Sequence, residues 1–413
     1  MTKLEEMGAR ARKAARTLAV LGPEKEAALM KAAQALLAHE EEILMANRED
    51  LAAGEEKGLT PALLDRLRLT PARIASMAAA MEEVAKAADP IGQVLLGEKR
   101  PNGLEIQKIT VPLGVVGIIY EARPNVTSDA CALCLKAGNA VILRGGKEAL
   151  CSNKAIVRVL CDALTGAGLP LGSLQLVEDP GREAARELMG LTAYLDVLIP
   201  RGGAGLIRAV KEQAKVPVIE TGVGNCHVYV DESANLDMAA EIIFNAKTSR
   251  PSVCNAIETV LVHSAIADKA LPLMARRLSQ KQVELRGCPR VRAILPEALA
   301  ATEEDWATEY LDYILAVKVV DSLEEALDHI AAYSSGHSEC IVTESYANAQ
   351  RFLQQADSAA VYVNASTRFT DGGEFGLGAE IGISTQKLHA RGPMGLQALT
   401  SHKFLIRGSG QVR

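Results

Sequence analysis

The chain has 413 residues, and 48% of them are hydrophobic, which allows substantial cores in two or three domains. Its formal net charge is -6 and only 3% of its residues are aromatic, which argues against a nucleic-acid-binding protein. The first residues are acidic, and no apolar run approaches the roughly 20 residues of a membrane-spanning helix. We therefore expect a cytoplasmic protein without a signal peptide or membrane contact.

The first ninety residues are predicted to be helical. Residues 23–53 carry apolar side chains at helical spacing, with charged side chains opposite. Thr60 and Thr70 each precede a proline, and this pair is typical of an N-cap followed by the first helical turn. Residues 93–109 contain two strand-like runs around a Pro-Asn-Gly turn, which predicts a hairpin. Because an isolated hairpin is marginal in water, we expect it to pair with another strand, for which 403–407 is the candidate.

From residue 115 onward, short apolar runs alternate with helical stretches. The expected strands of the first block lie at 115–120, 140–143, 174–177, 194–199 and 216–219. A second block of alternation extends from residue 227 to about residue 364. This pattern is typical of βαβ units in parallel sheets with helices on both faces, so the fold class is α/β. Residues 366–395 are rich in glycine and polar side chains, and we expect them to form loops over a site.

The eight cysteines are expected to be reduced thiols in a cytosolic chain of this length. Cys131 and Cys134 form a CxxC pair, but a zinc site needs a second pair at a suitable spacing, which the sequence lacks. Their surroundings predict two thiols on the buried face of a helix. Nowhere do His, Cys and Asp residues recur at ligand spacing, so we expect no metal.

Cys254 is the strongest candidate for a reactive residue. Arg250 lies four positions before it, and Pro251, Ser252 and Asn255 make its surroundings polar and turn-like. A thiol becomes a nucleophile as thiolate, which nearby positive charge favours. The alternative is a buried cysteine that packs as a small apolar group. The polar surroundings favour the reactive interpretation.

Two glycine-rich turns follow predicted strands and precede predicted helices. Gly202 and Gly203 would let backbone amides at a helix N-terminus approach a pyrophosphate, although a plain tight turn is about equally compatible with the sequence. Arg144 and Lys147 flank the second turn, which includes Gly145. Two cations at this position suit the 2′-phosphate of an adenine ribose, whereas the alternative is a solvated pair at a helix start.

Several motifs occur in the order used by the aldehyde dehydrogenase superfamily: 114–125, 219–222, Cys254 and 375–378. Within it the chain resembles the gamma-glutamyl phosphate reductases, whose signature is similar to residues 320–341. The resemblance implies two Rossmann-like three-layer domains plus a small β oligomerisation element. The implied boundaries are 1–90 and 112–226 for an NADP-binding domain, 227–398 for a catalytic domain, and 91–111 with 399–413 for the oligomerisation element.

The resemblance also implies roles for individual residues. Cys254 matches the family nucleophile, and Asn125 matches the asparagine that holds the oxyanion together with the Cys254 backbone N–H. For Asn125 the alternative is a helix N-cap. The implied cofactor is NADP, with contacts from Arg144, Gly145, Lys147, Gly202, Gly203 and Glu309. Glu220 matches a residue that activates water in aldehyde-oxidising relatives, and it is left out of the catalytic set because an acyl-phosphate reductase must avoid that water.

The implied reaction is the NADPH-dependent reduction of L-glutamyl 5-phosphate to L-glutamate 5-semialdehyde through a cysteine thioester, a step of proline biosynthesis. The candidates for substrate binding are Arg123, Arg250, Ser252, His337 and Asn364. The alternatives are a hydrolytic aldehyde dehydrogenase and a non-catalytic assembly protein of the same fold. We expect a homodimer or homotetramer built through the hairpin and the C-terminal strand. A transient contact with glutamate 5-kinase would protect the labile substrate, but the residues themselves carry no signal for it.

Overall fold

The computed structural model describes residues 1–413, with the backbone alone at position 62. The chain forms two compact units. The first consists of residues 1–221, 376–382 and 394–413, and the second of residues 222–375 and 383–393. The functional labels that the sequence suggested for the domains stay predictions. Among the described helices, none combines the length and apolar character that a bilayer crossing requires.

The first unit begins with helices, as the sequence predicted. They are α1 (Lys3–Leu18), α2 (Pro23–Ala38), α3 (Glu40–Glu56), α4 (Pro61–Leu67) and α5 (Pro71–Lys86). The side chain of Thr60 caps α4 by accepting a hydrogen bond from the Leu63 N–H, and that of Thr70 caps α5 in the same way from Arg73. Both threonine caps are thus confirmed. The predicted helical stretch 23–53 is divided into two helices at His39.

A four-stranded parallel sheet forms the centre of the first unit. Its strands are β3 (Val115–Tyr120), β4 (Ala140–Arg144), β5 (Leu174–Leu176) and β6 (Val197–Arg201), in the order β5-β4-β3-β6. The predicted strand at 216–219 is reduced to one isolated bridge between Leu198 and Val218. The sheet therefore ends at β6, and only this bridge extends it.

Helices cover both faces of this sheet. They are α6 (Asn125–Lys136), α7 (Leu150–Gly166), α8 (Arg182–Met189) and α9 (Ala204–Gln213). The crossovers through α6 and α7 advance from β3 to β5, whereas α8 leads back from β5 to β6 at the opposite edge. Because parallel crossovers are right-handed, α6 and α7 cover one face and α8 the other. Cys131 and Cys134 are buried in α6, and burial raises the pKa of both thiols, which confirms the packing interpretation.

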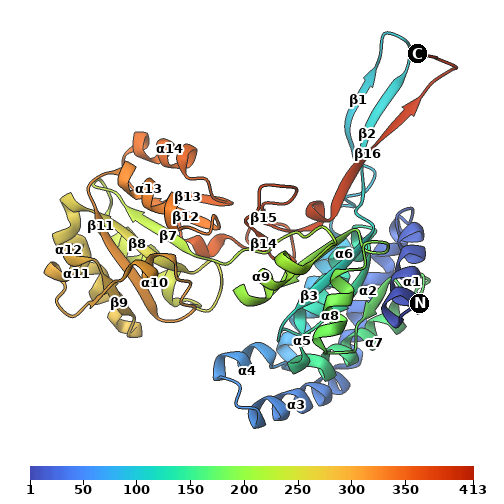
Figure 1. Cartoon of the computed structure of the whole chain (residues 1–413), viewed down its shortest axis with the longest axis horizontal. Helices are drawn as coiled ribbons and strands as arrows, with labels where there is room; N and C mark the ends of the chain where they lie inside the picture. The colour runs from blue at the N-terminus through green and yellow to red at the C-terminus, as the bar shows by residue number, and fades with distance from the viewer. The chain divides into compact units, whose positions relative to one another are not determined.

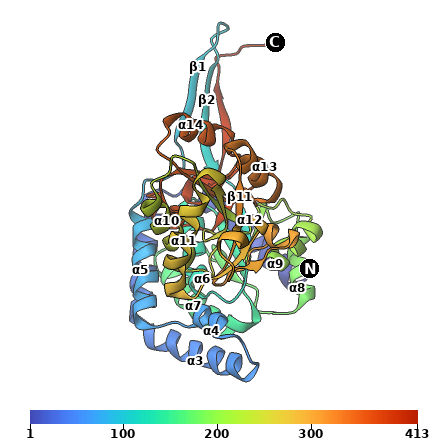
Figure 2. The same cartoon turned by 90° about the vertical axis from the view of Figure 1, so that its left-hand side faces the viewer.

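The hairpin and the C-terminal strand form a separate antiparallel arm. Strands β1 (Val94–Lys99) and β2 (Glu105–Pro112) pair around the predicted turn, and β16 (Thr400–Arg407) pairs with β2 along its whole length. The predicted pairing of the hairpin with the C-terminal strand is therefore confirmed. Within the first unit, the arm and helices α3 and α4 lie at opposite ends in both views (Figure 1 and Figure 2). The side chains of Phe404 and Ile406 are exposed on the arm.

The second unit contains a seven-stranded parallel sheet. Its strands are β7 (Cys226–Val230), β8 (Ile257–His263), β9 (Glu284–Gly287), β10 (Leu299–Ala300), β11 (Ile314–Val320), β12 (Ser338–Val342) and β13 (Ala360–Val363), in the order β10-β9-β11-β8-β7-β12-β13. Its helices are α10 (Leu236–Thr248), α11 (Ala267–Leu278), α12 (Pro289–Ile294), α13 (Leu323–Tyr333) and α14 (Tyr346–Gln355). Two short strands, β14 (Ile383–Ser384) and β15 (Gly392–Pro393), pair outside this sheet.

Alternating side chains place this sheet between two hydrophobic cores. Val228 and Val230 of β7 pack in one core with α10, α11 and α12, whereas Tyr229 packs in the other with α13 and α14. The period of two follows from the pleat of the strand. The second unit is therefore a three-layer α/β structure, as the fold class predicted.

Candidate active site

Cys254 lies in a short loop between α10 and β8 of the second unit. We call residues 249–256 the Cys254 loop. Strand β8 begins at Ile257, which pairs with Cys226 at the amino end of β7. Because Cys254 precedes the first residue of β8, it lies at the amino edge of the seven-stranded sheet. Its side chain is half-buried there. In most open α/β sheets ligands bind at the opposite, carboxyl edge, so this location does not follow from the fold class alone.

Gly224 and Cys226 lie directly behind Cys254. An ideal Cβ atom on Gly224 would lie 1.6 Å from the carbonyl oxygen of Cys254, so only glycine fits at this position. The Cys226 thiol donates a hydrogen bond of 3.2 Å to the same carbonyl oxygen. The backbone of Cys254 is thus held from behind by the segment that leads into β7.

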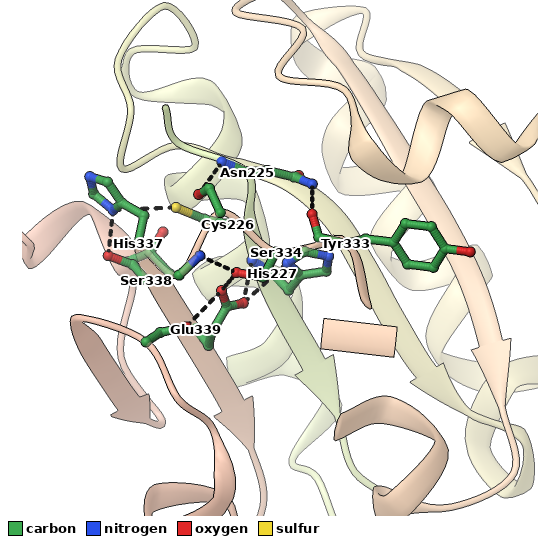
Figure 3. A network of polar contacts seen from close by, with 12 residues as sticks. Asn225, Cys226, His227, Tyr333, Ser334, His337, Ser338 and Glu339 are labelled. Atoms are coloured by element: carbon green, nitrogen blue, oxygen red, sulfur yellow. Dashed lines mark hydrogen bonds and ion pairs between the residues drawn. The ribbon is translucent and has the colours of Figure 1, made fainter. Parts of the chain in front are cut away.

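A buried polar network fixes this segment in turn (Figure 3). The amide of Asn225 donates to the carbonyl oxygens of Trp306 and Tyr333, at 2.8 Å each. The carboxylate of Glu339 is buried and accepts a hydrogen bond of 2.9 Å from the His227 N–H. Tyr333 and Glu339 belong to the signature segment 320–341, so the network explains in physical terms why this segment bears on Cys254.

His337 is brought to the same region. Its side chain is fully buried, and Nδ1 lies 2.8 Å from Ser338 Oγ and 3.6 Å from the Cys226 sulfur. Figure 3 shows the imidazole beside the Cys226 thiol. His337 therefore reaches the Cys254 backbone through one intervening residue, Cys226. Its predicted role in substrate binding stays a prediction.

Glu309 also contacts the segment behind Cys254. Its Oε1 accepts a hydrogen bond of 2.8 Å from the Gly224 N–H. The sequence assigned Glu309 to the cofactor ribose, and that role stays a prediction. Within the second unit, the Glu309 carboxylate contacts Gly224, which in turn packs against the Cys254 carbonyl group.

Arg368 is a neighbour of the Cys254 loop that the sequence analysis missed. Its Nε donates to Ser249 Oγ at 3.0 Å, and its Nη1 donates to the side-chain oxygen of Asn255. These two partners lie on either side of Cys254, and Arg250 is on the same loop. Burial and the positive charge of Arg250 lower the pKa of Arg368. The only available signal was an arginine within the polar segment 366–395.

Asn364 is placed differently from the other predicted substrate residues. It follows the carboxyl end of β13, whereas Cys254 precedes the amino end of β8. Both groups of its amide bind the Thr343 backbone, with the oxygen accepting at 2.9 Å and the nitrogen donating at 2.9 Å. The fold therefore does not bring Asn364 to the Cys254 loop, whereas Arg250 and Ser252 are part of that loop.

A buried ion pair spans the ends of the Cys254 loop. Lys247 Nζ of α10 lies 2.5 Å from Glu258 Oε2 of β8, and both side chains are buried. The Leu311 N–H donates to the other carboxylate oxygen at 3.2 Å. Burial raises the pKa of Glu258 to about 7 despite the opposing effect of Lys247, and burial lowers the pKa of Lys247. The pair anchors both segments that carry the loop.

The glycine-rich turns of the first unit lie at the carboxyl ends of its strands. Gly145 follows β4, and a Cβ atom there would lie 2.1 Å from the side-chain nitrogen of Asn153, which is itself buried without a hydrogen-bond partner. Gly202 and Gly203 follow β6, and the Gly203 N–H donates at 2.8 Å to the carboxylate of Glu121. This turn therefore already binds an anion, as expected for a helix N-terminus.

Arg144 lies beside these turns but has local partners. Its guanidinium donates to the carbonyl oxygens of Pro180 at 2.7 Å and Gly181 at 3.3 Å. Burial lowers the pKa of Arg144, and the nearby carboxylates of Glu148 and Asp179 oppose this shift. Those carboxylates weaken the attraction of this corner for a 2′-phosphate. The exposed Lys147 adds a second cation at the start of the following helix.

Asn125 is the first residue of α6, and its side chain is exposed. Its amide nitrogen donates to the Asp129 carboxylate at 3.1 Å, and the N-cap position is occupied by Pro124. The N-cap alternative for Asn125 is therefore wrong. Burial raises the pKa of Asp129 to about 6. Arg123 is half-buried in the turn that leads into α6.

These residues fit a dinucleotide. Gly145 lets the Asn153 side chain approach the turn closely, the Gly203 N–H points at an anion, and the Asn153 amide retains an unused donor. The turns at this site follow the carboxyl ends of β3, β4 and β6. The ends flank the point where the strand order reverses between β3 and β6, which is where α/β sheets bind such ligands. Among the described residues, no three His, Cys, Asp or Glu side chains are grouped to hold a metal ion.

Comparisons with known proteins agree with this geometry. The model of the aldehyde dehydrogenase family matches residues 2–287. A gamma-glutamyl phosphate reductase from Moorella thermoacetica is 62% identical over 412 residues, which cover 100% of this chain and 99% of that protein. The crystal structure of gamma-glutamyl phosphate reductase from Thermotoga maritima matches with a TM-score of 0.97 at 50% identity, over 100% of both chains. The chain therefore belongs to the aldehyde dehydrogenase family, and within it to the gamma-glutamyl phosphate reductases.

Proposed function

We propose that this protein reduces L-glutamyl 5-phosphate to L-glutamate 5-semialdehyde with release of phosphate, as a step of proline biosynthesis. The observation that carries the proposal is the Cys254 loop, whose backbone is held by Gly224 and Cys226 and whose sequence surroundings are polar. The names of relatives that are 62% and 60% identical over nearly the whole chain support the same substrate.

The Cys254 thiolate attacks the carbonyl carbon of the acyl phosphate. A carbon–sulfur bond forms, the carbon–oxygen bond to phosphate breaks, and phosphate leaves with the bonding electron pair. The product is a thioester on Cys254. After reduction, the carbon–sulfur bond of the thiohemiacetal breaks, the sulfur leaves as thiolate, and the hydroxyl proton is released with formation of the aldehyde. The side-chain amide of Asn125 and the Cys254 N–H are assigned to the oxyanion, and each such donor typically contributes about 3–4 kcal/mol.

The proposed cofactor is NADPH, bound by Arg144, Gly145, Lys147, Gly202, Gly203 and Glu309. When bound, it supplies the hydride that reduces the thioester. Its preference over NADH rests on the cations Arg144 and Lys147, against which Glu148 and Asp179 act. Binding of a phosphate at Gly203 requires the exposed Glu121 carboxylate to turn away from the Gly203 N–H.

The substrate carries phosphate, carboxylate and ammonium groups, for which we propose Arg123, Arg250, Ser252 and His337 as contacts. Asn364 is not included, since its amide binds the Thr343 backbone. Glu220 pairs with Lys211 at 3.1 Å within the first unit. This ion pair engages the carboxylate within the first unit, which supports the exclusion of Glu220 as a water-activating base.

We further propose a homodimer or homotetramer in the cytoplasm, assembled through the arm of β1, β2 and β16. The exposed Phe404 and Ile406 side chains and the unpaired outer edge of β1 support this assembly. A transient contact with glutamate 5-kinase would serve the labile acyl phosphate.

The decisive experiment is oxidation of glutamate 5-semialdehyde by the full chain with NADP⁺ or NAD⁺, with and without phosphate. We expect turnover to require phosphate and to be faster with NADP⁺. Full activity without phosphate would instead support a hydrolytic aldehyde dehydrogenase. Cys254→Ala should abolish turnover, and mass spectrometry should no longer detect the acyl adduct. Cys288→Ala, which changes another half-buried thiol, should retain both turnover and the adduct. Cofactor binding by fluorescence without any turnover of the wild-type protein would support the non-catalytic alternative.

A further inference from the structure

Arg368 bridges the two ends of the Cys254 loop. It belongs to the single turn of 3-10 helix at Thr367–Phe369. Its Nε donates to Ser249 Oγ at 3.0 Å, and its Nη1 donates to the Asn255 side-chain oxygen. One guanidinium therefore contacts residues on both sides of Cys254. These contacts with the loop fix the position of the Arg368 side chain, which therefore does not extend freely into solvent.

Return contacts make this arrangement rigid. The Asn255 amide nitrogen donates to the carbonyl oxygens of Arg368 at 3.3 Å and Thr370 at 2.9 Å. The Thr367 hydroxyl donates to the Asn255 carbonyl oxygen at 2.7 Å. Asn255 and the Arg368 segment thus hold each other through side chain and backbone. The guanidinium is preorganised at the loop before any ligand arrives.

The hydrogen-bond partners of the Arg368 side chain are neutral. A serine hydroxyl and an amide oxygen hold the guanidinium without cancelling its charge. The charges of Arg250 and Cys254 both act on Arg368, in opposite directions, and Asp371 adds a further negative charge nearby. Because Arg250 and Arg368 repel each other beside one thiol, an anion that binds both guanidinium groups is stabilised there.

We propose that Arg368 and Arg250 bind the phosphate group that is exchanged at Cys254. This inference rests on the proposed function. In the acyl phosphate, the phosphate is bonded through one oxygen to the carbon that the sulfur attacks, so it must lie next to Cys254. Arginine matches phosphate with two parallel hydrogen bonds. In the forward direction the two guanidiniums stabilise the phosphate as it leaves, and in the reverse direction they bind inorganic phosphate for attack on the thioester.

The test is steady-state oxidation of glutamate 5-semialdehyde, with inorganic phosphate and semialdehyde varied separately. Arg368→Gln should raise the KM for phosphate by about tenfold to hundredfold, with less than a threefold change in the KM for semialdehyde. Arg250→Gln, on an exposed side chain, should act in the same direction and needs no repacking. Arg351→Gln, which changes a half-buried arginine of α14 paired with Glu324, is the matched control and should change neither value.

Alkylation of Cys254 by iodoacetamide gives a readout besides turnover. Inorganic phosphate should slow the alkylation of the wild-type protein, and this protection should be lost in Arg368→Gln and Arg250→Gln. Arg368→Lys, which keeps the charge but loses the fork, should retain part of the protection. If both glutamine variants keep the wild-type KM for phosphate, or if the KM for semialdehyde rises instead, the assignment to phosphate is overturned.

The two proposals can fail separately. Wild-type oxidation at full rate without phosphate would remove the proposed function. Phosphate-dependent oxidation that neither arginine variant alters would leave the proposed function intact and refute only the phosphate site.

Discussion

Gly224 offers the sharpest test of how Cys254 is held. In Gly224→Ala the new Cβ atom would lie 1.6 Å from the carbonyl oxygen, 2.3 Å from the carbonyl carbon and 2.4 Å from the Cα of Cys254. Real Cβ atoms essentially never approach another heavy atom within 3.0 Å. The Cys254 backbone, or the segment behind it, must therefore move by about 1.4 Å, the difference between 3.0 Å and 1.6 Å.

A displacement of this size has a large cost in rate. Misplacement of a reacting group by about 1 Å lowers the rate roughly hundredfold, because the aligned near-attack geometry is lost. We therefore expect kcat to fall by at least about 100-fold, equivalent to about 2.7 kcal/mol in the activation barrier. Overpacking typically lowers the free energy of unfolding by about 1–3 kcal/mol, so the variant should still fold.

The assay compares kcat for phosphate-dependent semialdehyde oxidation with thermal unfolding of the same preparations. Gly166→Ala is the matched control, because a Cβ atom at this position at the end of α7 would meet nothing within 4 Å. It should keep wild-type kcat and stability. A folded Gly224→Ala protein with kcat within twofold of the wild-type value would refute the close packing of Gly224 against Cys254.

Three further predictions concern the ion pair and the arm. Lys247→Met leaves the Glu258 carboxylate buried without its cation, so the free energy of unfolding in urea should fall by about 3–5 kcal/mol. The double variant Lys247→Met/Glu258→Leu should recover most of this loss. Equal losses in the single and the double variant would contradict this. Because the pKa of Glu258 is raised, the folded state keeps a proton that the unfolded state loses above its ordinary pKa of 4.5. The contribution of Glu258 to the free energy of unfolding therefore falls as the pH rises from about 4.5 to 7. The fall is at most about 1.4 kcal/mol per pH unit. Urea unfolding at pH 5 and pH 7 should show a smaller decline in Glu258→Gln than in the wild type, and an identical decline would exclude this role. Phe404→Glu combined with Ile406→Glu places charges on the exposed face of the arm and should shift sedimentation toward the monomer, whereas unchanged sedimentation would remove the arm as the assembly element.

Local patterns in the sequence were sufficient for much of the fold. The caps at Thr60 and Thr70, the hairpin turn and the alternating strands depend on hydrogen bonds and side-chain periods within a few residues, so they are visible without tertiary information. Strand 216–219 was overpredicted because an apolar run fits a strand, but pairing depends on a partner, and here only Val218 bridges to Leu198. The family motifs pointed to Cys254 because the proposed thioester chemistry requires a cysteine side chain at this position.

The sequence by itself determined the α/β class, the choice of Cys254 as the candidate nucleophile and the glycine turns, since each is encoded in neighbouring residues. Only the tertiary structure decided which distant residues reach Cys254. Arg368 contacts Asn255 across 113 positions, and Gly224 is required as glycine only because the Cys254 carbonyl packs against it. Asn364, in contrast, is turned toward Thr343 at the carboxyl end of its strand. Contacts of this kind depend on how the strands and crossovers bring distant segments together, and a linear pattern carries no record of them.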